Sequence, residues 1–244
     1  MQIVESVINP KIQLEPWIWI LIEKYISPRV AGCDKANANG VDGPILSATL
    51  HNLARFPGFV RNPEEHHLEI KFMYQQICLD IPKVAYHLGL STDGTGVQSR
   101  LQAMYSLLLC IALVLNGLLR AFDPFDTFML EEAGRFSDEA TYLAERAKQY
   151  RPLGASHIGM CLMAAWAVTD DDTFRRTTTE RLLLEYQSDF AMARWLEGGL
   201  WLKKKYFDLR QRLGNAEAAE FYEGLCPVHR KDEPQVCEEL CCMQ

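Results

Sequence analysis

The sequence predicts an all-α protein, a multi-helix bundle of antiparallel helices around a buried, apolar central helix. Three observations support this prediction. Apolar residues recur at spacings of three and four along most of the 244 residues, which is the period of an amphipathic helix. No segment longer than a few residues alternates between polar and apolar side chains, as a half-buried strand would. The apolar fraction of 48% is enough to fill the core of one large domain.

Two helices and a loop are predicted in the first part of the chain. The first helix covers residues 17–25, between Pro16 and Pro28. Its apolar side chains are Trp17, Ile18, Ile20, Leu21, Ile22 and Tyr25. Gly, Asn and Asp residues then predict a loop over 32–43, and a second helix is expected over 45–56.

The next helical pattern covers residues 68–88. Its apolar side chains at helical spacing are Ile70, Met73, Ile77, Val84 and Leu88. Pro82 interrupts the pattern, because proline removes a backbone donor and crowds the preceding turn. The sequence therefore predicts a kink or two short helices, followed by a loop over 91–96.

Residues 101–119 form the most apolar segment of the chain and leave two alternatives. They carry no charged side chain, lie between Arg100 and Arg120, and are about as long as a membrane span. The residues that interrupt the apolar surface are Gln102, Ser106, Asn116 and Gly117. The flanks also lack a one-sided basic bias. A fully buried central helix is therefore the main expectation, and a membrane span is the alternative.

The rest of the chain predicts a series of shorter helices. Their ranges are 136–150, 158–168, 173–187, 191–213 and 216–225. Ser137 and Ser156 are the expected N-caps of the first two. The side chains expected to be buried in the third are Phe174, Leu182, Leu183 and Tyr186.

The chain is expected to form one helical domain, residues 1–225, and a flexible Cys-rich tail, residues 226–244. The tail leaves a second alternative open, because four of its side chains have the chemistry of zinc ligands. These are Cys226, His229, Cys237 and Cys241. A single structural zinc ion held by them is the alternative to a reduced, metal-free tail, and no other cofactor is expected.

Charge and cysteine content limit the classes of function. With 25 Lys and Arg against 32 Asp and Glu, the net charge is -7, so the surface as a whole repels polyphosphates and anionic lipids. Direct binding to nucleic acid or to a membrane is therefore not expected. Cys33, Cys78, Cys110 and Cys161 are spread singly, as buried free thiols are. Residues 1–10 show no secretory signal, so the cytosol or the nucleus is expected.

Residues 136–202 resemble the C-terminal part of fungal-specific transcription factors. The matching elements are the sequence Tyr150-Arg151-Pro152-Leu153-Gly154, the sequence Ala164-Ala165-Trp166, the acidic turn of Asp170, Asp171 and Asp172, and the helix over 195–201. In that family, the helical regulatory domain follows a binuclear zinc-cluster module that binds DNA. This chain contains no run of six clustered cysteines, so it departs from the family at the DNA-binding module.

The resemblance implies a regulatory protein of the nucleus that acts through protein contacts, for example on the genes of secondary metabolism. Its expected partner is a protein, such as a transcription factor that carries the DNA-binding module. A homodimer and a small apolar effector are further alternatives that the sequence leaves open. Trp166, Trp195 and Trp201 would line the cavity for such an effector, although tryptophans at helical spacing are also ordinary core residues.

A different class of function, an all-α enzyme of secondary metabolism, is the alternative. Such an enzyme would fold or cyclise a small apolar metabolite. Its polar groups would come from His66 and His67 or from Asp170, Asp171 and Asp172. The aspartate turn lacks the third carboxylate of a magnesium-binding cyclase motif, because Phe174 occupies that position. The two histidines follow Glu64 and Glu65 without the spacing of a helical zinc site, and a solvated loop is the simpler interpretation.

Overall fold

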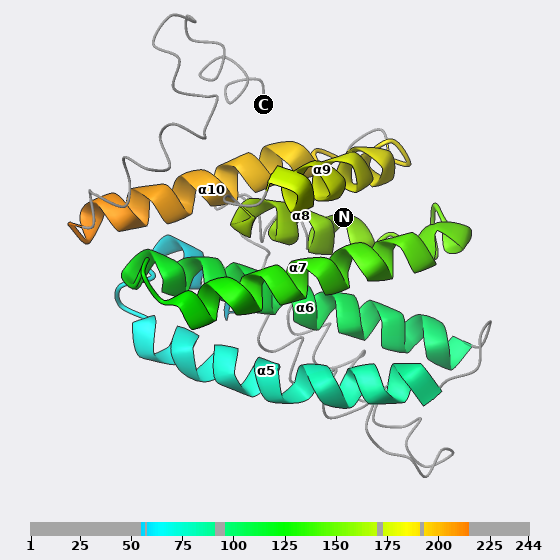
Figure 1. Ribbon diagram of the computed structural model, residues 1–244, viewed down its shortest axis with the longest axis horizontal. Helices are drawn as coiled ribbons and strands as arrows, with labels where there is room; N and C mark the ends of the chain where they lie inside the picture. The colour runs from blue at the N-terminus through cyan, green and yellow to red at the C-terminus, as the bar shows by residue number, and fades with distance from the viewer. Residues whose placement is uncertain (1–54, 57, 91–95, 170–172, 191–192, 215–244) are drawn as a thin grey trace, which may run out of the picture.

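A computed structural model describes residues 55–56, 58–90, 96–169, 173–190 and 193–214 of the chain (Figure 1). The helices are α5 (His67–Leu90), α6 (Gly96–Phe122), α7 (Thr127–Ala147), the short 3-10 helix η2 (Lys148–Tyr150), α8 (Ile158–Val168), α9 (Thr173–Gln187) and α10 (Trp195–Arg212). Within these ranges there is no strand, and the helices pack against one another. The predicted all-α, multi-helix fold is confirmed.

Helix α6 occupies the centre of the array. It packs against α5, α7, α8 and α10, and Figure 1 shows it between α5 and the upper helices. In the described part of the chain, it is the one helix that is long and apolar enough to cross a membrane by length and composition, yet 89% of its most apolar stretch is buried inside the protein. The expected buried central helix is therefore confirmed.

Two of the residues that interrupt the apolar surface of α6 contact neighbouring helices. Asn116 is fully buried and donates to the Met129 carbonyl at 2.8 Å and to the Tyr74 hydroxyl at 3.1 Å. Gly117 leaves room for the ring of Tyr206, because a Cβ atom at this position would lie 2.4 Å from that ring. Buried polar groups are stable only when they are hydrogen-bonded, so these residues fix the position of α6 relative to its neighbours.

Helix α8 is a second central helix. All eleven of its residues are buried, and it packs against α6, α7, α9 and α10. Arg120 near the end of α6 donates to the Val168 carbonyl at the end of α8 at 3.0 Å. Two helices therefore share the interior, and α5 lies outside them with α6 as its main neighbour.

Both predicted serine caps are wrong. Helix α7 begins at Thr127, and the Asp126 side chain caps it by accepting from the Met129 N–H at 3.1 Å. Ser137 lies inside that helix, where it donates to the Ala133 carbonyl at 2.7 Å. His157, not Ser156, precedes the first residue of α8 and makes no side-chain cap bond. A serine next to an apolar run satisfies the local pattern of a cap even where the helix starts elsewhere.

Two further expectations differ from the structure. Helix α5 continues through Pro82 as a single helix, so the alternative of two short helices is wrong, while the kink stays a prediction. Pro82 is exposed, so the backbone bond it removes lies where water can replace it. Phe174, which was expected inside, is 80% exposed at the start of α9, whereas Leu182, Leu183 and Tyr186 are buried as expected.

Candidate functional site

Helix α5 carries two apolar faces. The inner face packs against α6, and its buried side chains include Ile70, Met73, Ile77, Ile81, Val84 and Leu88. On the opposite side, five large apolar side chains are between 61% and 79% exposed. These are Leu68, Phe72, Leu79, Tyr86 and Leu90, and we call them the outer face of α5.

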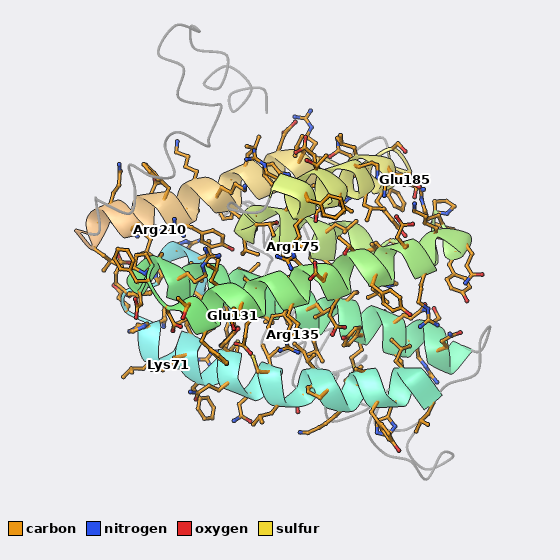
Figure 2. All side chains as sticks on the ribbon, in the orientation of Figure 1. Lys71, Glu131, Arg135, Arg175, Glu185 and Arg210 are labelled. Carbon is orange, nitrogen blue, oxygen red and sulfur yellow. The ribbon has the colours of Figure 1, made fainter. Side chains whose placement is uncertain are left out.

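The outer face follows one side of the whole helix, with the exposed residues Gln75 and Lys83 between its apolar side chains. Its residues are separated by four, seven, seven and four positions, which places them on one side of a helix with 3.6 residues per turn. From first to last they span about 33 Å at 1.5 Å per residue. Figure 1 shows α5 along one edge of the array, and Figure 2 places Lys71 on the same edge.

A stripe of this kind is unusual on a surface helix. The side of a surface helix that faces water is normally polar, whereas here five side chains together expose on the order of several hundred Å² of apolar surface. Apolar patches of this size mark sites of contact with other proteins, with membranes or with ligands. The outer face of α5 is therefore the candidate functional site.

Sequence reasoning identified the inner face of α5 and missed the outer one. The signal was present, because Leu68, Phe72 and Leu79 repeat at helical spacing in the same segment. In the sequence, a helix with apolar stripes on two opposite sides has nearly the same pattern as a helix that is buried on every side. Only the position of α5 at the edge of the array separates the two.

A polar cluster connects α5, α6 and α7 behind the inner face. The Tyr74 hydroxyl donates to Glu132 Oε2 at 2.7 Å and accepts from Asn116. Burial, followed by the bond to Glu132, raises the pKa of Tyr74 well above its ordinary value. Burial also raises the pKa of the neighbouring Cys78 thiol to about 11. Tyr74 and Cys78 are therefore both neutral at physiological pH, so neither is present as a phenolate or thiolate nucleophile.

The tryptophans predicted to line a ligand cavity pack against α8 and α10. The Trp166 ring covers Gly199 of α10, where a Cβ atom would lie 2.7 Å from ring atom Cε3. In return, Trp195 of α10 covers Gly159 of α8, where a Cβ atom would lie 2.5 Å from the indole Nε1. Trp201 is half-buried against the same core. The indole ring of each helix thus packs against a glycine of the other helix. The ligand cavity lined by these tryptophans stays a prediction.

Charged side chains surround Trp166. Its indole N–H donates to Glu180 Oε2 at 3.0 Å. The Lys203 ammonium lies 4.3 Å and the Arg176 guanidinium 5.6 Å from the ring centroid, within the range of cation–π contacts. Trp166 therefore links α8, α9 and α10. Its indole N–H is bound by Glu180, and Lys203 and Arg176 lie over its ring.

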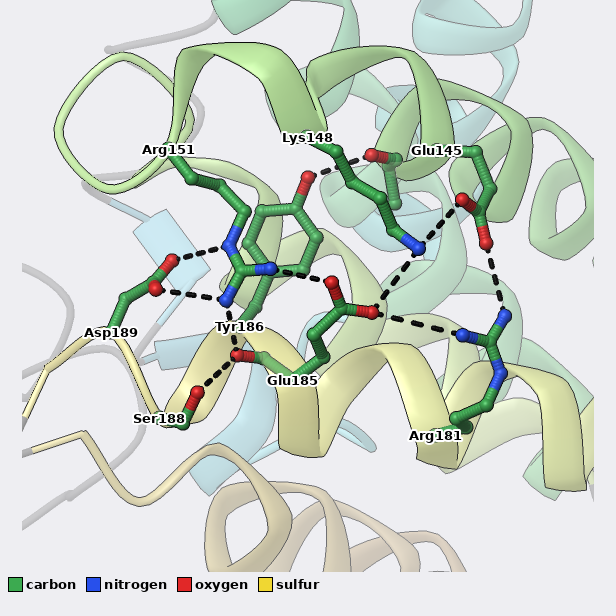
Figure 3. A network of polar contacts seen from close by, with 9 residues as sticks. Glu145, Lys148, Arg151, Arg181, Glu185, Tyr186, Ser188 and Asp189 are labelled. Carbon is green, nitrogen blue, oxygen red and sulfur yellow. Dashed lines mark hydrogen bonds and ion pairs between the residues drawn. The ribbon is translucent and has the colours of Figure 1, made fainter.

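A network of ion pairs joins the end of α7 to the end of α9 (Figure 3). Arg151 forms a bidentate pair with Asp189, with Nε–Oδ2 and Nη2–Oδ1 distances of 2.7 and 2.8 Å. The same guanidinium donates to the Glu185 carboxylate at 2.5 Å and to the Glu185 carbonyl at 2.7 Å. The bond to Asp189 raises the pKa of Arg151, so this cation stays charged at any physiological pH.

The remaining members of the network extend it along both helices. Lys148 lies 2.7 Å from Glu145 and 3.1 Å from Glu185, and its bond to Glu145 lowers the pKa of that carboxyl. The Tyr186 hydroxyl donates to the Ala144 carbonyl at 2.7 Å (Figure 3). All of these charges bind one another, which is the pattern of a clamp between helices and not of a site that receives a ligand.

The residues that carry the family resemblance thus have structural roles. Arg151 clamps the turn after η2 onto α9, Trp166 packs in α8, and Trp195 packs at the start of α10. They specify how the helices are arranged and leave the function open. Comparison with models of protein families, with curated proteins and with solved structures finds no match. The resemblance to fungal-specific transcription factors remains a prediction.

The two candidate histidines lie at the start of α5, where His66 Nδ1 lies 3.6 Å from Glu69 Oε2. His67 stacks on Phe122 with the ring centroids 4.0 Å apart, and His66 packs near Phe59 at 5.4 Å. Glu64 forms an ion pair with Arg212 of α10 at 2.8 Å. Among the described residues, no group of three or more His, Cys, Asp or Glu side chains is arranged to hold a metal ion.

Several candidate residues lie outside the part of the chain that the structure describes. The aspartate turn belongs to this group, and so do the potential zinc ligands of the tail. They are Asp170, Asp171, Asp172, Cys226, His229, Cys237 and Cys241. The structure describes three free thiols, and Cys110 and Cys161 are buried, as expected, while Cys78 is partly buried. Burial raises the pKa of Cys110 to about 12.

Proposed function

We propose that this chain is a helical regulatory protein that acts by binding other proteins, of the type that follows the zinc-cluster module in fungal-specific transcription factors. The outer face of α5 carries the proposal. Its side chains take no part in the core formed by α6 and α8, yet they are as apolar as core residues. A stripe of exposed leucine and aromatic side chains along one helix is suited to packing against a helix of a partner protein.

The partner we propose is a DNA-binding transcription factor in the nucleus. The net charge of -7 opposes direct binding of this chain to the phosphate backbone, so contact with DNA would go through the partner. The five side chains of the outer face are uncharged, with Lys71 and Lys83 beside them, so affinity for the partner would come mainly from buried apolar area.

The test is a gene-deletion strain complemented with variants of the full chain. Phe72→Glu with Leu79→Glu places two charges in the centre of the outer face, while Tyr142→Glu changes an aromatic residue of α7 that is 64% exposed. Deletion should change the transcripts of a defined gene set, and the wild type and Tyr142→Glu should restore them. The outer-face variant should fail to restore them although its level in the cell is unchanged.

Two results would contradict the proposal. The first is an unchanged transcript profile together with accumulation of a metabolic intermediate, which would identify the chain as an enzyme. The second is full restoration by the outer-face variant, which would show that this surface does not carry the regulatory contact.

A further inference from the structure

We propose that residues 17–25 of the same chain bind the outer face of α5, and that a partner protein competes with them for this surface. The competition rests on the proposed function, whereas binding within the chain does not. The argument uses the apolar character of residues 17–25, the point at which the chain enters α5, and the length of the connection.

Residues 17–25 match the outer face in chemistry and period. Trp17, Leu21 and Tyr25 are spaced four apart, and Ile18 and Ile22 lie beside them, so a helix over this range presents a stripe of aliphatic and aromatic side chains. The outer face of α5 offers the same two kinds of side chain at the same period. Such a short helix gains most of its stability by packing this stripe against another apolar surface.

The chain that follows residue 54 is held at the beginning of α5. Arg55 forms an ion pair with Glu69 in the first turn of that helix. Phe56 and Phe59 are each 1% exposed and anchor the same stretch in the core. Residues 17–25 are therefore tethered to one end of the outer face.

The connection is long enough for the distance to be covered. Residues 26–54 supply 29 residues, which can reach up to about 100 Å when fully extended. Helix α5 has 24 residues and a length of about 36 Å. A helix over 17–25 is about 14 Å long, so it can reach any part of the stripe and covers less than half of it at a time.

The tether also decides between this occupant and a second copy of the chain. A covalent connection within one chain gives an effective concentration of about millimolar, whereas separate copies meet at micromolar or lower concentrations in solution. The segment of the same chain therefore has an advantage of about a thousandfold over the same segment of a neighbouring molecule.

Photo-crosslinking of the purified full chain tests the proposal. The amino acid p-benzoylphenylalanine replaces Phe72 in one variant and Tyr86 in another, and it replaces Tyr142 of α7 in the control. After irradiation and trypsin digestion, mass spectrometry should find the peptide of residues 12–24 attached to α5. The yield should be at least tenfold higher than from position 142 and independent of protein concentration.

A second variant separates specific packing from accidental proximity. In the chain with the probe at position 72, Leu21→Glu should lower the yield at least tenfold, while Glu23→Gln, on the other side of the predicted helix, should leave it unchanged. A mixture of isotopically labelled and unlabelled protein distinguishes bonds within one chain from bonds between two chains.

Three results would overturn the proposal. They are crosslinks that join labelled to unlabelled chains, crosslinks to segments other than 12–24, and a yield that Leu21→Glu does not change. The readout is made on purified protein, so it fails or succeeds separately from the transcript test. Crosslinks within the chain without any effect on transcription would retain this inference and reject the proposed function.

Discussion

Replacing Gly199 by alanine should destabilise the protein, because the space above this glycine is filled by Trp166. The new Cβ atom would lie 2.7 Å from Trp166 Cε3 and 3.1 Å from Cζ3, closer than carbon atoms approach without a shift. The ring has little freedom to retreat, since it is 3% exposed and bound to Glu180, with Lys203 over its face. Overpacking of this kind costs about 1–3 kcal/mol, whereas alanine gains about 1 kcal/mol over glycine in a helix.

Gly89 of α5 is the matched control, because a Cβ atom there would meet nothing within 4 Å. Gly89→Ala should gain up to about 1 kcal/mol from helix propensity alone. The two variants should therefore differ in free energy of unfolding by about 1–3 kcal/mol, which corresponds to about 2–4 °C in Tm for each kcal/mol in a chain of this size. Urea and thermal unfolding, followed by far-ultraviolet circular dichroism, measure both quantities.

A double-mutant cycle assigns the effect to the indole. In a Trp166→Leu background the clash is absent, so Gly199→Ala should become neutral or stabilising. If instead Gly199→Ala were as stable as Gly89→Ala in the wild-type background, the ring would have free space beside it. That result would refute the close packing described above and would support the predicted cavity lined by Trp166, Trp195 and Trp201.

Three further predictions concern the clamp, the histidine before α8 and the buried thiols. Arg151→Lys should lower the free energy of unfolding by about 1–3 kcal/mol, because lysine cannot form the bidentate pair with Asp189. The control Arg146→Lys, on the exposed side of α7, should change it by less than about 0.5 kcal/mol. Urea denaturation measures both. Burial lowers the pKa of His157 from 6.5 to about 4, so the unfolded chain binds a proton in this range that the folded chain does not. Wild-type stability should fall by about 3 kcal/mol more than that of His157→Gln as the pH drops from 6.5 to 4 in the same urea assay. Iodoacetamide at pH 8 should leave Cys110 and Cys161 unmodified in native protein and modify both in urea, as peptide mass spectrometry would show, because burial keeps these thiols protonated.

The central helix could be predicted from the sequence because few environments suit a segment so apolar. Residues 101–119 had to be buried in protein or in lipid. Asn116 correctly indicated burial in protein, since it binds the Met129 carbonyl of α7. The start of α7 could not be predicted from Ser137, since Asp126 offers an equally good cap eleven residues earlier. Local patterns allow both starts, and the contacts of the whole helix select one.

The candidate site was harder to predict than the fold, because its signal depends on position in the array. Leu79 and Ile77 are equally apolar in the sequence, but one is 61% exposed and the other is 1% exposed. No local pattern separates them, since each belongs to a stripe with the same period. The Arg151 network could not be predicted from the sequence for a similar reason. Its partners, Glu185 of α9 and Asp189 just after α9, lie more than thirty residues further along the chain.

Because α5 lies at the edge of the array, its inner face contributes to stability while its outer face is available for binding. Helices α6 and α8 form the interior, and α5 contributes to it through one face only, so charges introduced on the other face leave the packed contacts of Ile70, Ile77 and Val84 intact. An exposed leucine contributes little to the free energy of folding, because it is nearly as solvated in the folded chain as in the unfolded chain. Phe72→Glu and Leu79→Glu should therefore leave the packed core folded while removing the contacts made by the outer face. Any loss in the free energy of unfolding should come from the contact with residues 17–25 alone.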